Sequence, residues 1–137
     1  MWTYLQSTGE LLHDDKHVAF GYSGAPGAAK NNPSMQNVHN TGPIPRGIYE
    51  IGEPEDTQAH GPFVLPLTPH ADNQMFGRAG FLIHGDSIQH PGTASQGCII
   101  LARLFRLRIA QSGDQHLLVK DIEQPMIASD VDGNLSV

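Results

Sequence analysis

The sequence predicts a single, mainly β domain that contains one short helix. The chain has 137 residues, of which 39% are hydrophobic, and this is enough for one modest core. Its 15 Gly and 10 Pro make turns frequent. Most of its apolar runs have the length of strands, and one has helical spacing. We expect one domain over residues 1–137, with its core in about 2–122 and a polar tail at 127–137.

Three short runs near the N-terminus predict a meander of strands. They cover Trp2–Gln6, Glu10–His13 and His17–Phe20, and they are separated by Ser-Thr-Gly and by Asp-Asp-Lys. Residues 21–42 lose all periodicity, and we expect a long surface loop there.

Three central strands follow. In 44–51 the side chains alternate after Gly47, so that Tyr49 and Ile51 share one side and Ile48 and Glu50 the other. The apolar runs 62–67 and 79–84 are also of strand length, and the second ends at His84.

The last regular elements are a helix and a strand. Apolar residues at 101, 104, 105, 107 and 109 follow a helical period, and Gly113 is placed to end the helix. We interpret Arg103, Arg106 and Arg108 as its solvated face. His116–Lys120 is expected to be the final strand.

Charge and composition exclude several classes of partner. The formal net charge is −6 and there are only 8 Lys and Arg, which argues against nucleic-acid binding. No apolar stretch is long enough to span a bilayer, and the first 20 residues do not resemble an export signal. We therefore expect a chain made in the cytoplasm without a signal peptide.

The chemistry is expected at Cys98, the one cysteine of the chain. A free thiol is mostly protonated at neutral pH, so a nucleophilic cysteine needs a base such as an imidazole nearby. His84 is the candidate for this general base and acid, because it ends a strand and the Pro-Gly turn at 91–92 lets the chain fold back.

Several residues could assist this pair. The Gly85 carbonyl, Asp86 or Ser87 could orient His84, and the sequence does not choose among them. The amides of Gly97 and Cys98, near an expected helix start, could stabilise an oxyanion. The candidates for substrate binding are Ser95, Gln96, Arg78, Tyr22 and Ser23.

Two separated motifs resemble the L,D-transpeptidase family. Ser95-Gln-Gly-Cys-Ile-Ile100 with His84 upstream resembles its histidine and Ser/Thr-His-Gly-Cys signature, and 41–51 is similar to its Thr-Pro-x-Pro-x-Gly-x-Phe/Tyr-x-Ile strand. Gln96 stands where the family usually has a histidine, and Ile100 where it often has a polar residue.

A narrower resemblance is to the small L,D-transpeptidase-related effectors of type VI secretion systems. It rests on Gly21-Tyr-Ser-Gly, Asn31-Asn-Pro, the segment 75–86 and the cysteine segment, and it covers most of residues 2–120.

The resemblance implies an L,D-transpeptidase-like β-sandwich or barrel that acts on peptidoglycan tetrapeptide stems. Cys98 would attack the bond between meso-diaminopimelate and the terminal D-Ala, as an L,D-carboxypeptidase or by exchanging D-amino acids. No cofactor and no metal is implied. The expected partners are stem peptides, a cognate immunity protein and a secretion-system carrier, and the expected place of action is the periplasm of a recipient bacterium.

Two other classes of function remain open at this point. A peptidoglycan-binding module without catalysis would not need the cysteine and histidine. A zinc-dependent hydrolase could use His84, Asp86, His90 and Cys98, although their spacing matches no compact zinc pattern. A phage-derived lytic role would leave the same active site.

Overall fold

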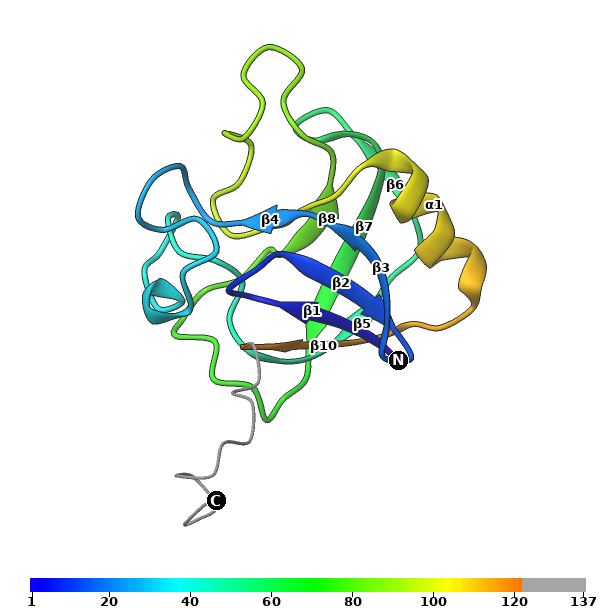
Figure 1. Ribbon diagram of the computed structural model, residues 1–137, viewed down its shortest axis with the longest axis horizontal. Helices are drawn as coiled ribbons and strands as arrows, with labels where there is room; N and C mark the ends of the chain where they lie inside the picture. The colour runs from blue at the N-terminus through cyan, green and yellow to red at the C-terminus, as the bar shows by residue number, and fades with distance from the viewer. Residues whose placement is uncertain (122–137) are drawn as a thin grey trace.

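The computed structural model describes residues 1–121, so the predicted polar tail at 127–137 lies outside the described residues. Within the described range, no helix has the length and apolar character needed to cross a bilayer. The domain is mainly β with a single short α-helix among the described residues, as the sequence predicts (Figure 1).

The strands form one mixed sheet. The described elements are β1 (Trp2–Leu5), β2 (Glu10–His13), β3 (Lys16–Phe20), β4 (Tyr22–Ser23), the 3-10 turn η1 (Pro33–Met35), β5 (Gly47–Ile51), β6 (Glu55–Thr57), β7 (Gly61–Pro69), β8 (Leu82–His84), β9 (Ile99–Ile100), α1 (Arg103–Ser112) and β10 (His116–Lys120).

The order of strands in the sheet is β3-β2-β1-β10-β5-β7-β8-β9-β4, and β6 pairs with β7 beside this path. Its two edge strands, β3 and β4, follow one another in the chain with only Gly21 between them. The sheet therefore has to curl round, as Figure 1 shows for β4 and β3. Two of its pairings, β1 with β10 and β8 with β9, are parallel.

The core lies on the concave side of this curled sheet. The predicted alternation in β5 is confirmed, because Tyr49 and Ile51 are buried while Ile48 and Glu50 are exposed. The core also takes residues from the two ends of the chain, including Trp2, Tyr4, Leu117 and Val119. Parallel pairing of β1 with β10 brings these residues together.

The helix ends where the sequence predicts, but the side that it buries is not the predicted one. Gly113 adopts the left-handed conformation with φ 74° and terminates α1. Arg106 and Ile109 are the buried positions of α1, whereas Leu104 is 60% exposed. The expectation that Arg106 lies on the solvated face is therefore wrong. Its guanidinium points inward and donates to backbone carbonyls of residues 62, 63 and 101.

Three short strands, β4, β6 and β9, were not predicted. β9 separates the cysteine from the helix, so Cys98 precedes a strand and does not lie at a helix start. β4, inside the predicted loop 21–42, pairs with β9 through Tyr22 with Ile100 and Ser23 with Ile99. Two-residue strands carry no periodicity, and only their partners define them.

Candidate active site

A cleft of about 910 Å³ opens beside β8 and β9. Both His84 and Cys98 line it. The cleft walls come from six segments of the chain: 39–40, 59–60, 77–81, 84–89, 93–94 and 96–98.

The parallel pairing of β8 with β9 sets the relation between the two candidate catalytic residues. Ile83 pairs with Ile99 and His84 with Ile100, which places Cys98 opposite Leu82. Because side chains alternate along strands, positions 82, 84 and 98 face the same side. The register thus places residue 98 two positions before Ile100, the pairing partner of His84, and on the same side of the sheet as His84.

The ring of His84 is oriented by its own neighbour. Its Nδ1 lies 2.8 Å from the carbonyl oxygen of Gly85. Because a carbonyl oxygen can only accept, Nδ1 carries the ring proton and donates a hydrogen bond to it. Nε2 is then left as the proton acceptor. Of the three orienting groups that the sequence left open, the structure brings the Gly85 carbonyl to the ring.

Asp86, the second of those candidates, has a different set of partners. Its Oδ1 accepts hydrogen bonds from the hydroxyl of Tyr22 at 2.7 Å and from the amide of Ser87 at 2.8 Å. The amide of Gly92 also donates to it. Asp86 therefore organises the loop that follows His84, and Tyr22 ties this loop to β4 by accepting from the Ala94 amide as well.

Burial keeps both candidate catalytic groups neutral. It lowers the pKa of His84, and although the Gly85 hydrogen bond opposes this shift, His60 and Arg106 lower that pKa further. Burial raises the pKa of Cys98, against the opposing effects of the Leu82 amide and Arg78. Both shifts favour the neutral forms of the pair, a thiol and an uncharged imidazole.

The turn at residues 95–97, directly before Cys98, is held by two buried serines. Ser95 Oγ accepts from the amides of Gly24 and Gly97, at 2.9 and 3.1 Å, and donates to the Cys98 carbonyl at 2.7 Å. Ser23 Oγ donates to the Gly97 carbonyl at 2.9 Å. These serines were expected to bind substrate, but neither lines the cleft, and their hydroxyl groups position the turn.

Gly97 is required by the shape of this turn. Its φ is 143°, and a Cβ atom there would lie 2.5 Å from Arg78 Nη2 and 2.9 Å from Phe81. Its amide is already paired with Ser95, so the predicted oxyanion contact would fall to the amide of Cys98. That contact stays a prediction.

The remaining predicted residues divide into one buried and one open side chain. Arg78 is 7% exposed, and its guanidinium donates to the carbonyls of Gln36, Gly42, Pro43 and Gln96. Its predicted contact with substrate remains untested. Gln96 is exposed and lines the cleft two residues before Cys98, and its predicted contact with substrate stays a prediction.

Two histidines of the cleft were missed by the sequence reasoning. The ring of His60 lies 4.6 Å from that of His84, centroid to centroid. His39 also lines the cleft, and its Nε2 forms a hydrogen bond with the Phe76 carbonyl at 2.7 Å. No spacing pattern signals either residue, because the turn after β6 and the loop before β5 reach the cleft only in the folded chain.

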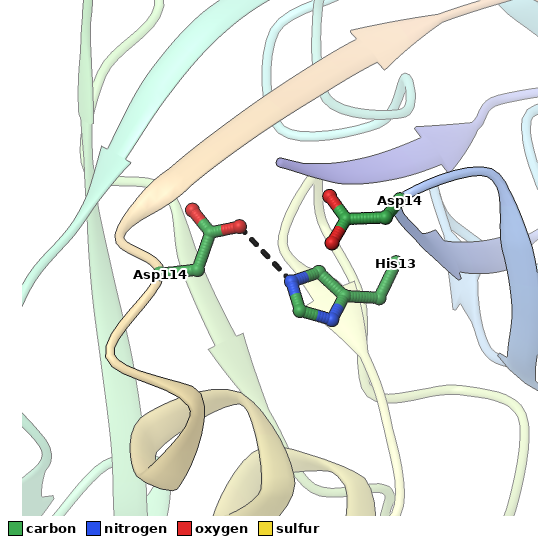
Figure 2. Close-up of side chains that lie close together, drawn as sticks. All are labelled: His13, Asp14 and Asp114. Atoms are coloured by element: carbon green, nitrogen blue, oxygen red, sulfur yellow. Dashed lines mark hydrogen bonds and ion pairs between the residues drawn. The ribbon is translucent and has the colours of Figure 1, made fainter.

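Among residues 1–121, a group of three potential metal ligands occurs away from the cleft (Figure 2). It consists of His13, Asp14 and Asp114. His13 Nε2 bonds Asp114 at 2.9 Å, and the Met1 ammonium bonds both carboxylates. The group includes none of His84, Asp86, His90 and Cys98, so these residues do not form the cluster that a zinc hydrolase would need.

Comparison with known proteins gives a family for this chain. The family model of the Tlde1 domain matches residues 17–122, which includes the cleft and both candidate catalytic residues. No curated protein and no solved structure gives a significant match. The matched segment covers most of the chain, and the chain therefore belongs to the Tlde1 domain family, a family of type VI secretion effectors.

Proposed function

We propose that this effector is a cysteine acyl-transfer enzyme that acts on the peptide stems of bacterial peptidoglycan. The observation that supports this most directly is that Cys98 and His84 line one cleft, with His84 Nδ1 bonded to the Gly85 carbonyl. That bond leaves Nε2 as the base, which is the arrangement that nucleophile activation requires.

The substrate is a tetrapeptide stem, and the bond is the L,D amide between meso-diaminopimelate and the terminal D-Ala. This assignment rests on the resemblance of the motifs at 41–51 and 95–100 to L,D-transpeptidases. An open cleft fits a peptide that enters from solvent, and exposed Gln96 lines this cleft together with Cys98, where its side chain would contact the stem.

The reaction proceeds in two steps. Nε2 of His84 takes the thiol proton while the sulfur bonds to the carbonyl carbon of the substrate. The C–N bond then breaks, and D-Ala leaves with the proton from His84, so that a thioester holds the shortened stem. An acceptor, deprotonated by His84, attacks the thioester and releases Cys98.

The acceptor decides the product. Water gives a tripeptide stem, which is L,D-carboxypeptidase activity, and a D-amino acid gives an exchanged stem. Either product removes donors for normal crosslinking. We therefore propose that the protein acts as a toxin in the periplasm of a recipient bacterium, after delivery by a secretion-system carrier, and that an immunity protein protects the producing cell.

The test uses mass spectrometry of purified tetrapeptide muropeptides. They are incubated with the protein or with Cys98→Ala, with and without an added D-amino acid. Loss or exchange of the terminal D-Ala by the unmutated protein alone is the expected result. Intact tetrapeptide in every sample would overturn the assignment of the bond.

The proposed protection is tested separately. Expression of the chain with a periplasmic export signal should slow growth, and Cys98→Ala should not. Co-expression of the gene next to it in the producing genome should restore growth. If the unmutated protein and Cys98→Ala slow growth equally, the toxicity does not depend on the thiol.

A further inference from the structure

Two buried arginines flank the candidate catalytic pair without a carboxylate partner. Arg78 is 7% and Arg106 6% exposed. All hydrogen bonds found for their guanidinium groups go to backbone carbonyls. Among residues 1–121, none of the ion pairs includes an arginine. A buried charge without a counterion is costly, so a site that retains two of them is suited to holding negative charge.

Arg78 lies on the side of the nucleophile. Its Nη2 donates to the Gln96 carbonyl at 3.2 Å, two residues before Cys98. The same nitrogen occupies space beside Gly97, where a Cβ atom would approach it to 2.5 Å. Any side chain at position 97 would therefore displace the Arg78 guanidinium from the turn at residues 95–97.

Arg106 has the matching place on the side of the base. Its Nε donates to the Leu101 carbonyl at 3.0 Å, and its Nη1 donates to the carbonyls of Pro62 and Phe63. A Cβ atom on Gly85 would lie 2.9 Å from its Nη2. Each catalytic residue thus has a glycine as chain neighbour, and each glycine leaves room for a buried guanidinium.

We propose that Arg78 and Arg106 are positioning residues that set the charge state of the catalytic pair. Arg78 favours negative charge on the sulfur of Cys98, and Arg106 keeps His84 neutral until it receives the thiol proton. The proposal rests on the Cys98 and His84 roles of the proposed function, but not on the substrate. It can therefore fail or succeed independently of the peptidoglycan assignment.

Other charged groups face the same pair and have to be separated from the arginines. His84 is faced by His60 from the turn before β7, by Arg106 from α1 and by Asp86 from the following loop. Arg106 and His60 lower the pKa of His84, and Asp86 raises it. Cys98 is faced by Arg78, which lowers its pKa against the larger effect of burial.

Arg78 is tested by the pH profile of Cys98 alkylation with iodoacetamide, which needs no substrate. Arg78→Gln should move the midpoint to higher pH and slow alkylation at pH 7, because a smaller fraction of the thiol is then ionised. Arg78→Lys keeps the charge and should stay near the unmutated profile. Arg46→Gln, at an exposed loop position, is the matched control.

The lysine variant separates charge from structure. If Arg78 serves only as a hydrogen-bonding brace, Lys and Gln should impair the turn alike, and this outcome would overturn the proposal for Arg78. If circular dichroism shows that Arg78→Lys folds and Arg78→Gln does not, the lysine variant alone is the test. A shift of its alkylation midpoint to higher pH would contradict a role of the charge, because lysine keeps that charge.

Arg106 is tested by NMR titration of the His84 ring. Arg106→Gln should raise the His84 midpoint relative to the unmutated protein, and Arg108→Gln on the exposed face of α1 should not. His60→Gln gives the separate contribution of that neighbour. A His84 midpoint unchanged by Arg106→Gln would overturn the proposal for Arg106.

Gly85→Ala provides a second route if Arg106→Gln does not fold. The φ of Gly85 is not in the positive range, so alanine suits its backbone, while the new methyl group displaces the guanidinium. The His84 midpoint should rise in this variant too. An unchanged midpoint would contradict the electrostatic role.

Discussion

At the scale of single residues, the active site depends on which hydrogen bond each polar group makes. His84 is the clearest case, because the carbonyl of Gly85 determines which ring nitrogen carries the proton. Ser95 is a second case, since one hydroxyl group joins the backbone of Gly24, Gly97 and Cys98.

The lowered pKa of His84 predicts the acid limb of the pH profile. A neutral imidazole is the form that the proposed mechanism requires, and burial favours this form below the pH at which an exposed histidine is protonated. Alkylation of Cys98 should therefore lose its histidine-dependent part only below about pH 6.5, the ordinary histidine value. Rates measured from pH 4 to 9 in the unmutated protein and in His84→Ala test this.

His84→Ala should also alkylate more slowly near neutral pH than the unmutated protein. Equal rates for the two proteins over the whole range would remove His84 as the base. Cys98→Ala, which has no thiol, controls for labelling elsewhere.

Ser95→Ala should destabilise the protein and disturb the nucleophile turn. The substitution leaves two amides and one carbonyl without their partner at a position that is 1% exposed. We expect a loss of about 2 kcal/mol in the free energy of unfolding, measured by urea titration. Ser34→Ala, where the serine is exposed, should change it much less. Similar values for the two variants would contradict the role of Ser95.

At the scale of elements, the loop at residues 85–94, which follows β8, is tied to β4 by one side chain, that of Tyr22. Tyr22, on β4, donates to Asp86 and accepts from Ala94, and so binds both ends of this loop. Burial and the Asp86 hydrogen bond raise the pKa of Tyr22 to about 12, so the hydroxyl stays protonated and able to donate at neutral pH.

Tyr22→Phe should therefore loosen the loop at residues 85–94 without unfolding the domain. The variant keeps the ring and loses both hydrogen bonds, at a cost of about 1 kcal/mol. Hydrogen exchange of the Ser87 and Ala94 amides should become faster, while exchange in β5 and β10 stays slow. Unchanged exchange in the loop would show that other contacts hold it.

At the scale of the whole molecule, the curled sheet and the helix are joined by a cluster near the N-terminus. Asp114, after α1, bonds His13 at the end of β2 (Figure 2). Burial alone would raise the pKa of Asp114, but hydrogen bonds from the Met1 ammonium and from His13 more than offset this and lower it.

The sign of this shift predicts how stability depends on pH. A carboxyl group whose pKa is lowered by folding stabilises the protein above its unfolded value, near pH 4, and this contribution is lost as the pH falls further. Asp114→Asn should thus cost about 1 kcal/mol at pH 7 and much less at pH 2.5, by urea unfolding. A difference that does not depend on pH would contradict the ionic contribution.

Much of this molecule could be predicted from its sequence, because the relevant signals are local. Alternation predicts β5, the short apolar runs predict the strands of the meander and β10, and Gly113 predicts the end of α1. The expectation that Cys98 and His84 share one site follows from residue types whose chemistry needs each other, and both line the same cleft. None of these inferences requires knowledge of the distant contacts.

The tertiary structure alone decided what depends on contacts between distant segments. Parallel pairing of β8 with β9 brings the segments of Cys98 and His84 to one cleft, and the fold also brings His60 into it. Arg106 shows the physical reason most clearly. Its spacing on a helix predicts a solvated side chain. In the structure, however, its buried guanidinium donates hydrogen bonds to the carbonyls of Leu101, Pro62 and Phe63. These acceptors come together only when the chain has folded.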